Sequence, residues 1–221
     1  MPLRSPNKYH QYRGNVRVTR PDVEPVTVED VKAQLRLDDS MDDDLLYLYI
    51  EAARDVAEEK TGLAFITQQW RMTIDHWPNT WEPWWDGVRQ GAITELRGSG
   101  RSSDIIIPRY PLQSVDSINA DGQPVVVADT FIADTQQRPG RLVIKRGATW
   151  PVALDRANGI DITYTAGFGS TEAEVPAAIR LGLLQMVATM YEHRGDGCSA
   201  ANAWKISGAA EMIGTYKAAM L

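Results

Sequence analysis

Residues 42–62 read DDDLLYLYIEAARDVAEEKTG, and this stretch decides the fold. Its apolar residues recur at the spacing of an α-helix that buries one side: Leu45, Leu46, Tyr49, Ile50, Ala52, Ala53, Val56 and Ala57. Three aspartates at the start and Thr61-Gly62 at the end are typical of helix termini. The sequence therefore predicts a helix roughly 30 Å long, on which the other helices pack.

Two further helices are expected to complete this core. Thr27–Leu37 begins with a sequence like a capping box and continues with apolar residues at helical spacing. A later helix starts near Pro176 and ends at Arg194-Gly195, and its apolar face holds Ile179, Leu183, Met186, Val187, Met190 and Tyr191. We predict that this face packs against the residues of the first helix that form its widest apolar stripe: Leu46, Ile50, Ala53 and Ala57.

The region between these helices has the alternating pattern of β-strands. Ile66–Asp75 alternates apolar and polar residues, as a half-buried strand does. Shorter β-rich runs follow at Ile105–Ile107, Val115–Ile118, Val125–Val127, Phe131–Ala133, Leu142–Lys145 and Ile160–Tyr164. Turn signals such as Asp121-Gly122 separate them, and no helical pattern lies between them to make parallel crossovers. We therefore predict an antiparallel meander.

These elements predict an α+β protein with a helical-bundle core and an inserted antiparallel β region. Residues 26–65 and 171–195 would form the helical core, and residues 66–170 the β-rich insertion. Residues 1–25 would be a basic N-terminal arm, and residues 196–221 a linker followed by a C-terminal docking helix.

Composition excludes several classes of protein. The chain has 221 residues, and its single Cys198 excludes an intramolecular disulfide framework. His10, His76 and His193 lack metal-ligand spacing, and the acidic run 38–44 lacks the pattern of a calcium loop. No apolar run reaches the roughly 18 residues of a membrane span, and the N-terminus has no signal-peptide core. We expect no catalytic site, metal, cofactor or membrane partner.

Charge is unevenly distributed near the N-terminus. Residues 1–20 hold five bases and no acid, whereas residues 21–59 hold thirteen acids and three bases. The five bases are Arg4, Lys8, Arg13, Arg17 and Arg20. This split favours contact of the arm with DNA or with the acidic segment of a neighbouring copy. A solvated tail in the isolated protein is the alternative, and we expect salt-sensitive ordering of the arm on assembly.

A cluster of tryptophans occupies a proline-rich stretch, WPNTWEPWW, at residues 77–85. Its members are Trp77, Trp81, Trp84 and Trp85. Such rings can anchor a protein interface or stack on sugars or bases. A loop folded back to cover the sheet is the structural alternative to an interface, and both stay open.

The last predicted helix, Ala209–Leu221, follows the stretch GDGCSAANA, which we interpret as a linker. Its apolar stripe consists of Met212, Ile213, Tyr216 and Met220. An isolated helix of this length is marginal in water. The stripe therefore predicts a docking surface, supplied either by the same domain or by another protein.

Three blocks of sequence follow one another in a specific order. They are LRLDDSMDDDLLYLYIEAARDVAEEKTGLAFITQQWRMTID, then IIIPRYPLQSVDSI, then TYTAGFGS followed by VPAAIRLGLLQMVATMYEHRG. Together these blocks, within residues 26–195, resemble the head–tail connector proteins of tailed bacteriophages and related gene transfer agents, also called adaptors or head-completion proteins. The arm 1–25 and the tryptophan stretch 77–85 fall outside the familiar pattern.

The resemblance implies a structural virion protein that assembles as a ring, a dodecamer, below the portal. Such a ring joins the capsid to the tail and helps to retain packaged DNA. Its implied partners are other copies of the chain, the portal protein, the next tail or stopper protein, and DNA passing through the lumen. The protein would be made in the host cytoplasm and reside in the neck of the virion, with the terminal helix docked on the portal. A hypothesis of another class is a tail-associated carbohydrate-binding or hydrolytic protein that uses the tryptophan stretch.

Overall fold

The computed structural model describes residues 14–78, 104–153 and 157–217, and it divides the chain into two compact units. The helical unit holds residues 19–68, 109–111 and 166–221, and the sheet unit holds the remainder. The chain therefore crosses between the units several times, and each unit draws on segments distant in sequence. Within the described residues, no helix is both long enough and apolar enough to cross a membrane.

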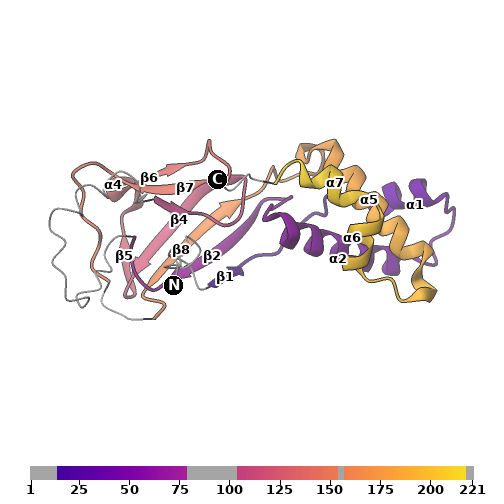
Figure 1. Ribbon diagram of the computed structural model, residues 1–221, viewed down its shortest axis with the longest axis horizontal. Coiled ribbons are helices and arrows are strands. Elements are labelled where there is room, and N and C mark those ends of the chain that lie inside the picture. Colours follow the sequence, from indigo (N-terminus) through magenta and orange to yellow (C-terminus); the bar gives the residue numbers. More distant parts are fainter. Residues whose placement is uncertain (1–13, 79–103, 154–156, 218–221) are drawn as a thin grey trace, which may run out of the picture. The chain divides into compact units, whose positions relative to one another are not determined.

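The helical unit contains five α-helices in its described part (Figure 1). They are α1 Val28–Leu35, α2 Asp43–Thr61, α5 Ala177–Glu192, α6 Ala200–Ile206 and α7 Ala209–Gly214. Two short 3-10 helices, η1 Glu172–Glu174 and η2 Arg194–Asp196, flank α5. The predicted capping box of α1 is present: the Thr27 side chain accepts from Asp30 N at 3.1 Å, and Thr27 N donates to the Asp30 carboxylate at 3.2 Å.

Helix α2 begins and ends as the sequence predicts, with one difference at its start. Gly62 ends the helix in the left-handed conformation, at φ 77°, and its N–H donates to Glu58 O. Asp42 is the N-cap residue, but its side chain does not cap the helix. Instead its carboxylate accepts a 2.6 Å hydrogen bond from the Tyr191 hydroxyl of α5. The residue expected to cap α2 therefore ties α2 to α5.

The predicted packing of α2 on α5 is confirmed. One buried cluster contains all eight residues that the pairing involves: Leu46, Ile50, Ala53 and Ala57 of α2 with Leu183, Met186, Val187 and Met190 of α5. Each helix contributes one apolar stripe to this cluster, because residues three and four apart share a face. The helical core thus forms between segments about 130 residues apart in sequence.

The predicted linker before the last helix is wrong. Residues 200–206 form α6, whose N-cap Ser199 accepts a hydrogen bond from Asn202 N at 3.3 Å. Ala203 and Trp204 of α6 are buried in the helical core. The small residues of this stretch suggested a flexible segment, but alanines favour a helix and allow it to pack closely.

The sheet unit contains a five-stranded sheet in the order β1-β2-β8-β4-β5. Its strands are β1 Gly14–Arg17, β2 Gln68–Ile74, β4 Leu112–Ala120, β5 Gln123–Val125 and β8 Ile160–Ala166. β1 pairs antiparallel with β2, and β4 pairs antiparallel with β5. Hydrogen bonds from Asp121 N to Gly159 O and from Gly167 N to Pro111 O join opposite ends of β4 and β8, so these strands are also antiparallel.

The predicted antiparallel pairing is thus confirmed, whereas the meander order is wrong. β8 lies between β2 and β4, although about forty residues of chain separate it from β4. A second, three-stranded sheet has the order β3-β7-β6 and consists of β3 Asp104–Ile106, β7 Arg141–Ile144 and β6 Phe131–Asp134, with the short helix α4 Val127–Thr130 before β6. The alternation of apolar residues identifies strands but does not specify their neighbours.

Candidate functional site

The histidines and the cysteine form no metal-binding group in the part of the chain that the structure describes. Within that part, no cluster of three or more His, Cys, Asp or Glu residues has the geometry to hold a metal ion. His10 lies outside the described residues. The candidate functional features of the described residues are therefore charged surfaces, apolar surfaces and buried polar groups.

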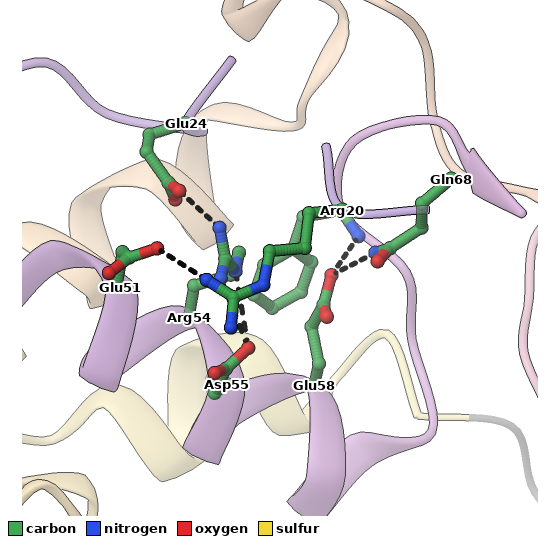
Figure 2. Close-up of polar contacts among 8 residues, drawn as sticks. Arg20, Glu24, Glu51, Arg54, Asp55, Glu58 and Gln68 are labelled. Carbon is green, nitrogen blue, oxygen red and sulfur yellow. Dashed lines mark hydrogen bonds and ion pairs between the residues drawn. The ribbon is translucent and has the colours of Figure 1, made fainter. Parts of the chain in front are cut away.

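A network of charged side chains lies on the second half of α2 (Figure 2). Arg54 is its centre and is only 2% exposed. Its Nη1 donates to the Glu24 carboxylate, and its Nη2 donates to Asp55 at 3.2 Å. A second ion pair joins Arg20 Nη1 to Glu51 at 3.7 Å. Two salt bridges of opposite polarity thus hold residues 20–24, which precede α1, against α2.

The electrostatics of this pair follow from its burial. Burial raises the pKa of Glu24 above its ordinary value, because desolvation outweighs the attraction of Arg54. Burial lowers the pKa of Arg54, but the carboxylates of Glu24, Asp55 and Glu58 outweigh that effect and leave this pKa raised. Arg54 therefore stays charged, and the removal of Glu24 would leave a buried cation with fewer partners.

Glu58 is the second buried group of the network. Its Oε1 accepts from Phe65 N and from Gln68 Nε2, both at 2.8 Å. Its backbone oxygen accepts from Arg109 Nη1 at 2.6 Å. Three residues further on, Thr61 O accepts from the Tyr110 hydroxyl at 2.7 Å. The end of α2 therefore anchors two other segments of the helical unit, around residues 65–68 and 109–110.

Arg54 and Glu58 hold neighbouring segments of the chain against α2, and the sequence pattern did not predict this role. Arg54 and Glu58 are charged, so the apolar stripe of α2 does not include them. The sequence nevertheless contained a signal for the burial of Arg54. Spacings of three and four residues place one row on the same face of α2: Ile50, Arg54, Ala57 and Thr61. A charged residue on such a row indicates a buried and paired side chain when its neighbours on the row are apolar.

The predicted basic arm is wrong for its last residues, which belong to the folded units. Gly14–Arg17 pair with Arg71–Thr73 and Trp70 as strand β1, and the Arg17 guanidinium lies 5.2 Å from the centre of the Trp70 ring. Arg20 forms its ion pair with Glu51 within the same chain. Arg4, Lys8 and Arg13 lie outside the described residues, so their role as subunit or DNA contacts stays a prediction.

Trp77 does not form an exposed interface within the chain. It is buried, its ring stacks on Trp150 with centroids 5.2 Å apart, and it lies 5.6 Å from the Phe131 ring. Its Nε1 donates to Pro151 O at 2.7 Å. For this residue the covering role is correct and the interface role is wrong, because the ring completes an aromatic cluster of the sheet unit. Trp81, Trp84 and Trp85 lie outside the described residues.

The helical unit itself covers Ile213 and part of Tyr216 of the C-terminal stripe. Ile213 is fully buried in the helical core, and Tyr216 packs on that core, edge to face with Phe168 at 6.4 Å. A Cβ on Gly182 of α5 would lie 2.8 Å from the Ile213 side chain, so glycine allows this close approach. The expectation that few core contacts depend on this helix is wrong. Met212 is half-buried, and Met220 lies outside the described residues.

A comparison with models of protein families matches the first part of the helical unit and strand β2. Residues 25–80 match the model of the phage gp6-like head-tail connector proteins. The resemblance to head–tail connectors is confirmed. The matched segment contains α1, α2 and β2, together with the anchors at Arg54 and Glu58. No curated protein matches the chain significantly.

Solved structures with the same fold come from gene transfer agent particles. A chain from the neck of an empty particle, computed with C6 symmetry, superposes with a TM-score of 0.69 at 19% identity, covering 95% of this chain and 97% of that one. A chain from the virion of a native particle has a TM-score of 0.67, also at 19% identity, with 94% and 96% covered. A chain from the neck of a native particle, computed with C12 symmetry, has a TM-score of 0.64 at 19% identity, with 95% and 97% covered. These likenesses confirm the predicted α+β fold.

Proposed function

We propose that this chain is a structural protein of a virion or gene transfer agent particle, located in the neck between head and tail. Copies of the chain form a ring below the portal, join the capsid to the tail and help to retain packaged DNA. The chain acts through its surfaces and has no catalytic role. The ring has twelve members, contacts the portal on one side and the next tail or stopper protein on the other, and lets DNA pass through its lumen.

One observation carries this proposal: the connector family match and the neck fold fall on the same chain. The match covers α1, α2 and β2, and the fold likeness extends over 95% of the residues. Symmetries C6 and C12 of the matched necks support a ring with a multiple of six copies. Trp77 is buried in the sheet unit, so one of the four tryptophans that the carbohydrate-binding hypothesis uses is not available to stack on a sugar.

The test removes the gene from cells that make the particles and restores it in trans. Without the chain we expect heads that lack tails and that lose their nuclease-protected DNA, and with the restored gene we expect tailed particles. Electron microscopy counts tails, and quantitative amplification after nuclease treatment measures retained DNA. A Val126→Lys variant alters an exposed residue of the sheet unit and serves as the matched control, which should restore tails fully.

Two results would contradict the proposal. Tailed particles with normal DNA content in the absence of the chain would show that it is not a connector. Specific binding of the purified chain to a glycan array, together with normal head–tail joining, would favour the carbohydrate-binding alternative instead.

A further inference from the structure

The side of α2 that faces away from the helical core carries exposed apolar residues among acids. Asp44, Leu48 and Asp55 recur at spacings of four and seven residues, so they lie on one stripe, opposite Leu46 and Ile50. Tyr47 adjoins this stripe, and Leu48 is 57% exposed. We name these four residues the α2 ridge: Asp44, Tyr47, Leu48 and Asp55. An exposed leucine beside an exposed tyrosine is typical of a contact surface when other such residues lie nearby.

A second exposed apolar surface lies on α5 and α6. Leu181 is 45% exposed and Ile206 is 64% exposed. One turn beyond Leu181, the Oε1 atom of Gln185 lies 3.8 Å from the position of a Cβ on Gly208, two residues after Ile206. This contact brings α5 and the residues just after α6 together. We name this surface, with the exposed Lys205, the α5–α6 face: Leu181, Gln185, Lys205 and Ile206.

The α2 ridge and Leu181 of the α5–α6 face point in different directions from the helical unit. The core stripes of α2 and α5 pack into one cluster, as described above. The α2 ridge lies on the side of α2 away from that cluster, and Leu181 lies on the side of α5 away from it. Two helices that face each other through their core stripes turn their outer stripes away from each other. One copy can therefore present both surfaces to two different neighbours.

The segments that carry the two surfaces differ in charge. Residues 28–61, which contain α1 and α2, hold eleven acids and four bases. Residues 177–217, which contain α5, α6 and α7, hold three acids and four bases. The acidic α2 ridge would therefore be repelled by another α2 ridge and is better matched by the α5–α6 face with Lys205. A single chain that carries both complementary surfaces matches a second copy of itself better than an unrelated partner.

We propose that the α2 ridge of one copy binds the α5–α6 face of the next copy. Leu48 and Tyr47 pack against Leu181 and Ile206, while Asp44, one turn before Leu48, lies near Lys205. Contact between two different faces repeats from copy to copy, and it generates a closed ring when the rotation between neighbours closes. The inference rests on the proposed ring function and deepens it, because it names the surfaces through which copies meet.

The first experiment inactivates each surface separately. Leu48→Asp disables the α2 ridge, and Ile206→Asp disables the α5–α6 face, so that two disabled surfaces also repel each other. Sedimentation velocity and native mass spectrometry of the purified full chain measure association. We expect each variant to weaken self-association by about 30-fold or more. Val126→Lys, which adds a charge at an exposed residue of the sheet unit, should leave it unchanged. Circular dichroism and thermal unfolding confirm that every variant is folded.

A mixture of the two variants gives the decisive result. The Leu48→Asp chain keeps an intact α5–α6 face, and the Ile206→Asp chain keeps an intact α2 ridge. One intact contact should form between them, so the mixture should give heterodimers that grow no further. Independently, oxidation of a Leu48→Cys, Ile206→Cys chain that also carries Cys198→Ser should give a ladder of covalent oligomers.

Several outcomes would overturn the inference. Unchanged association of both single variants, homodimers of either variant, or a wild-type chain that stays monomeric at every concentration would each do so. Rings in purified particles whose cysteine variant gives no ladder would refute these surfaces while leaving the connector function intact. A ladder in the purified chain, together with tailed particles formed without the gene, would instead refute the connector function alone.

Discussion

The two units of this molecule differ in how directly sequence determines structure. In the helical unit, one spacing of apolar residues specifies both the helix and the side that it buries, so α2 and α5 share a core despite their distance in sequence. In the sheet unit, the alternation of residues specifies strands, but β8 lies between β2 and β4, far from its neighbours along the chain. The residue spacing of a helix therefore largely determines which side it buries, whereas the place of a strand also depends on the strands beside it.

The largest expected effect concerns the end of the helical unit. A chain that ends at Ala203 loses Trp204, Ala209 and Ile213, all of which are buried in the helical core. Loss of several core side chains exceeds the 2–5 kcal/mol typical of a single large-to-small change, so we expect a loss of more than about 5 kcal/mol. The truncated chain should lack the near-ultraviolet circular dichroism and the cooperative thermal transition of the full chain.

A chain that ends at Lys217 keeps α6 and α7 whole and is the matched control. It should unfold at nearly the temperature of the full chain. A cooperative transition at the normal temperature in the chain that ends at Ala203 would show that α6 and α7 contribute little to the core, and that the C-terminal helix is separable.

The next effect concerns the aromatic cluster of the sheet unit. Trp77→Ala removes the ring that stacks on Trp150 and leaves a cavity beside Phe131, and it should cost about 3–5 kcal/mol. Hydrogen exchange should rise in β6 and β7 of the sheet unit. Trp77→Phe keeps an aromatic ring and should restore much of the loss. Equal stability of Trp77→Ala and the unchanged chain would mean that Trp77 covers no core.

Leu46→Ala makes the corresponding test of the helical unit. Leu46 is completely buried in α2, so its truncation should cost about 2–5 kcal/mol. Chemical denaturation with hydrogen exchange as the local probe should show the loss in α2 and α5. Leu48→Ala, on the exposed side of the same helix, is the matched control and should change stability by less than about 0.5 kcal/mol. Similar losses from both variants would refute the assignment of the two sides of α2.

Sequence alone predicted the α+β class, the bounds of α2 within a residue, and the packing of α2 on α5. It also predicted antiparallel strands close to their observed positions. It did not predict that β8 would join the centre of the sheet, because side-chain alternation carries no information on which strand lies next to which. It missed α6, because alanine and glycine in one stretch gave signals for both a helix and a linker.

The candidate surfaces were predicted less well, for a related reason. Trp77 was a candidate either for an interface or for a cover over the sheet, and Ile213 was a candidate for docking on the portal, since each belongs to a local apolar group with no visible cover in sequence. Trp77 packs against Phe131 and Trp150, and Ile213 packs against Gly182. Each of these contacts joins residues that lie 31 or more positions apart along the chain. Conversely, the buried Arg54 was overlooked, because its charge suggested exposure. Burial depends on contacts across the chain, which a local pattern does not reveal.

A smaller effect should follow from the anchor at the end of α2. Glu58→Ala leaves Phe65 N and Gln68 Nε2 without the carboxylate that accepts from them, and a buried donor left unsatisfied costs about 1–3 kcal/mol. Glu58→Gln keeps an acceptor oxygen and should cost less. Denaturant titration measures the stabilities, and amide exchange at Phe65 should rise most in the alanine variant. Unchanged exchange at Phe65 would show that the hydrogen bond does not hold this segment.

The smallest expected effects depend on pH. They involve one carboxylate in each unit, so the two units should respond to acid separately. In the helical unit, Glu174 accepts from the backbone N–H and the hydroxyl of Thr171, both at 3.0 Å, and these bonds lower its pKa below the ordinary 4.5. In the sheet unit, the hydrogen bond from Arg141 Nε at 2.9 Å lowers the pKa of Asp134 below 3.8.

A carboxylate with a lowered pKa in the folded state stabilises that state above its unfolded pKa, and this contribution is lost as pH falls through the folded pKa. We therefore expect the contribution of Glu174 to begin to fall near pH 4.5, and that of Asp134 to begin to fall nearer pH 3.8.

Glu174→Gln should make amide exchange around η1 and the start of α5 less dependent on pH, while leaving β6 and β7 unchanged. Asp134→Asn should do the reverse. Glu174 is exposed to solvent and Asp134 is only half-buried, so each effect is small. Added salt should reduce the Asp134 effect, since that bond joins opposite charges. If either substitution altered the acid response of both units equally, the carboxylates would act through the net charge of the whole chain rather than through these local bonds.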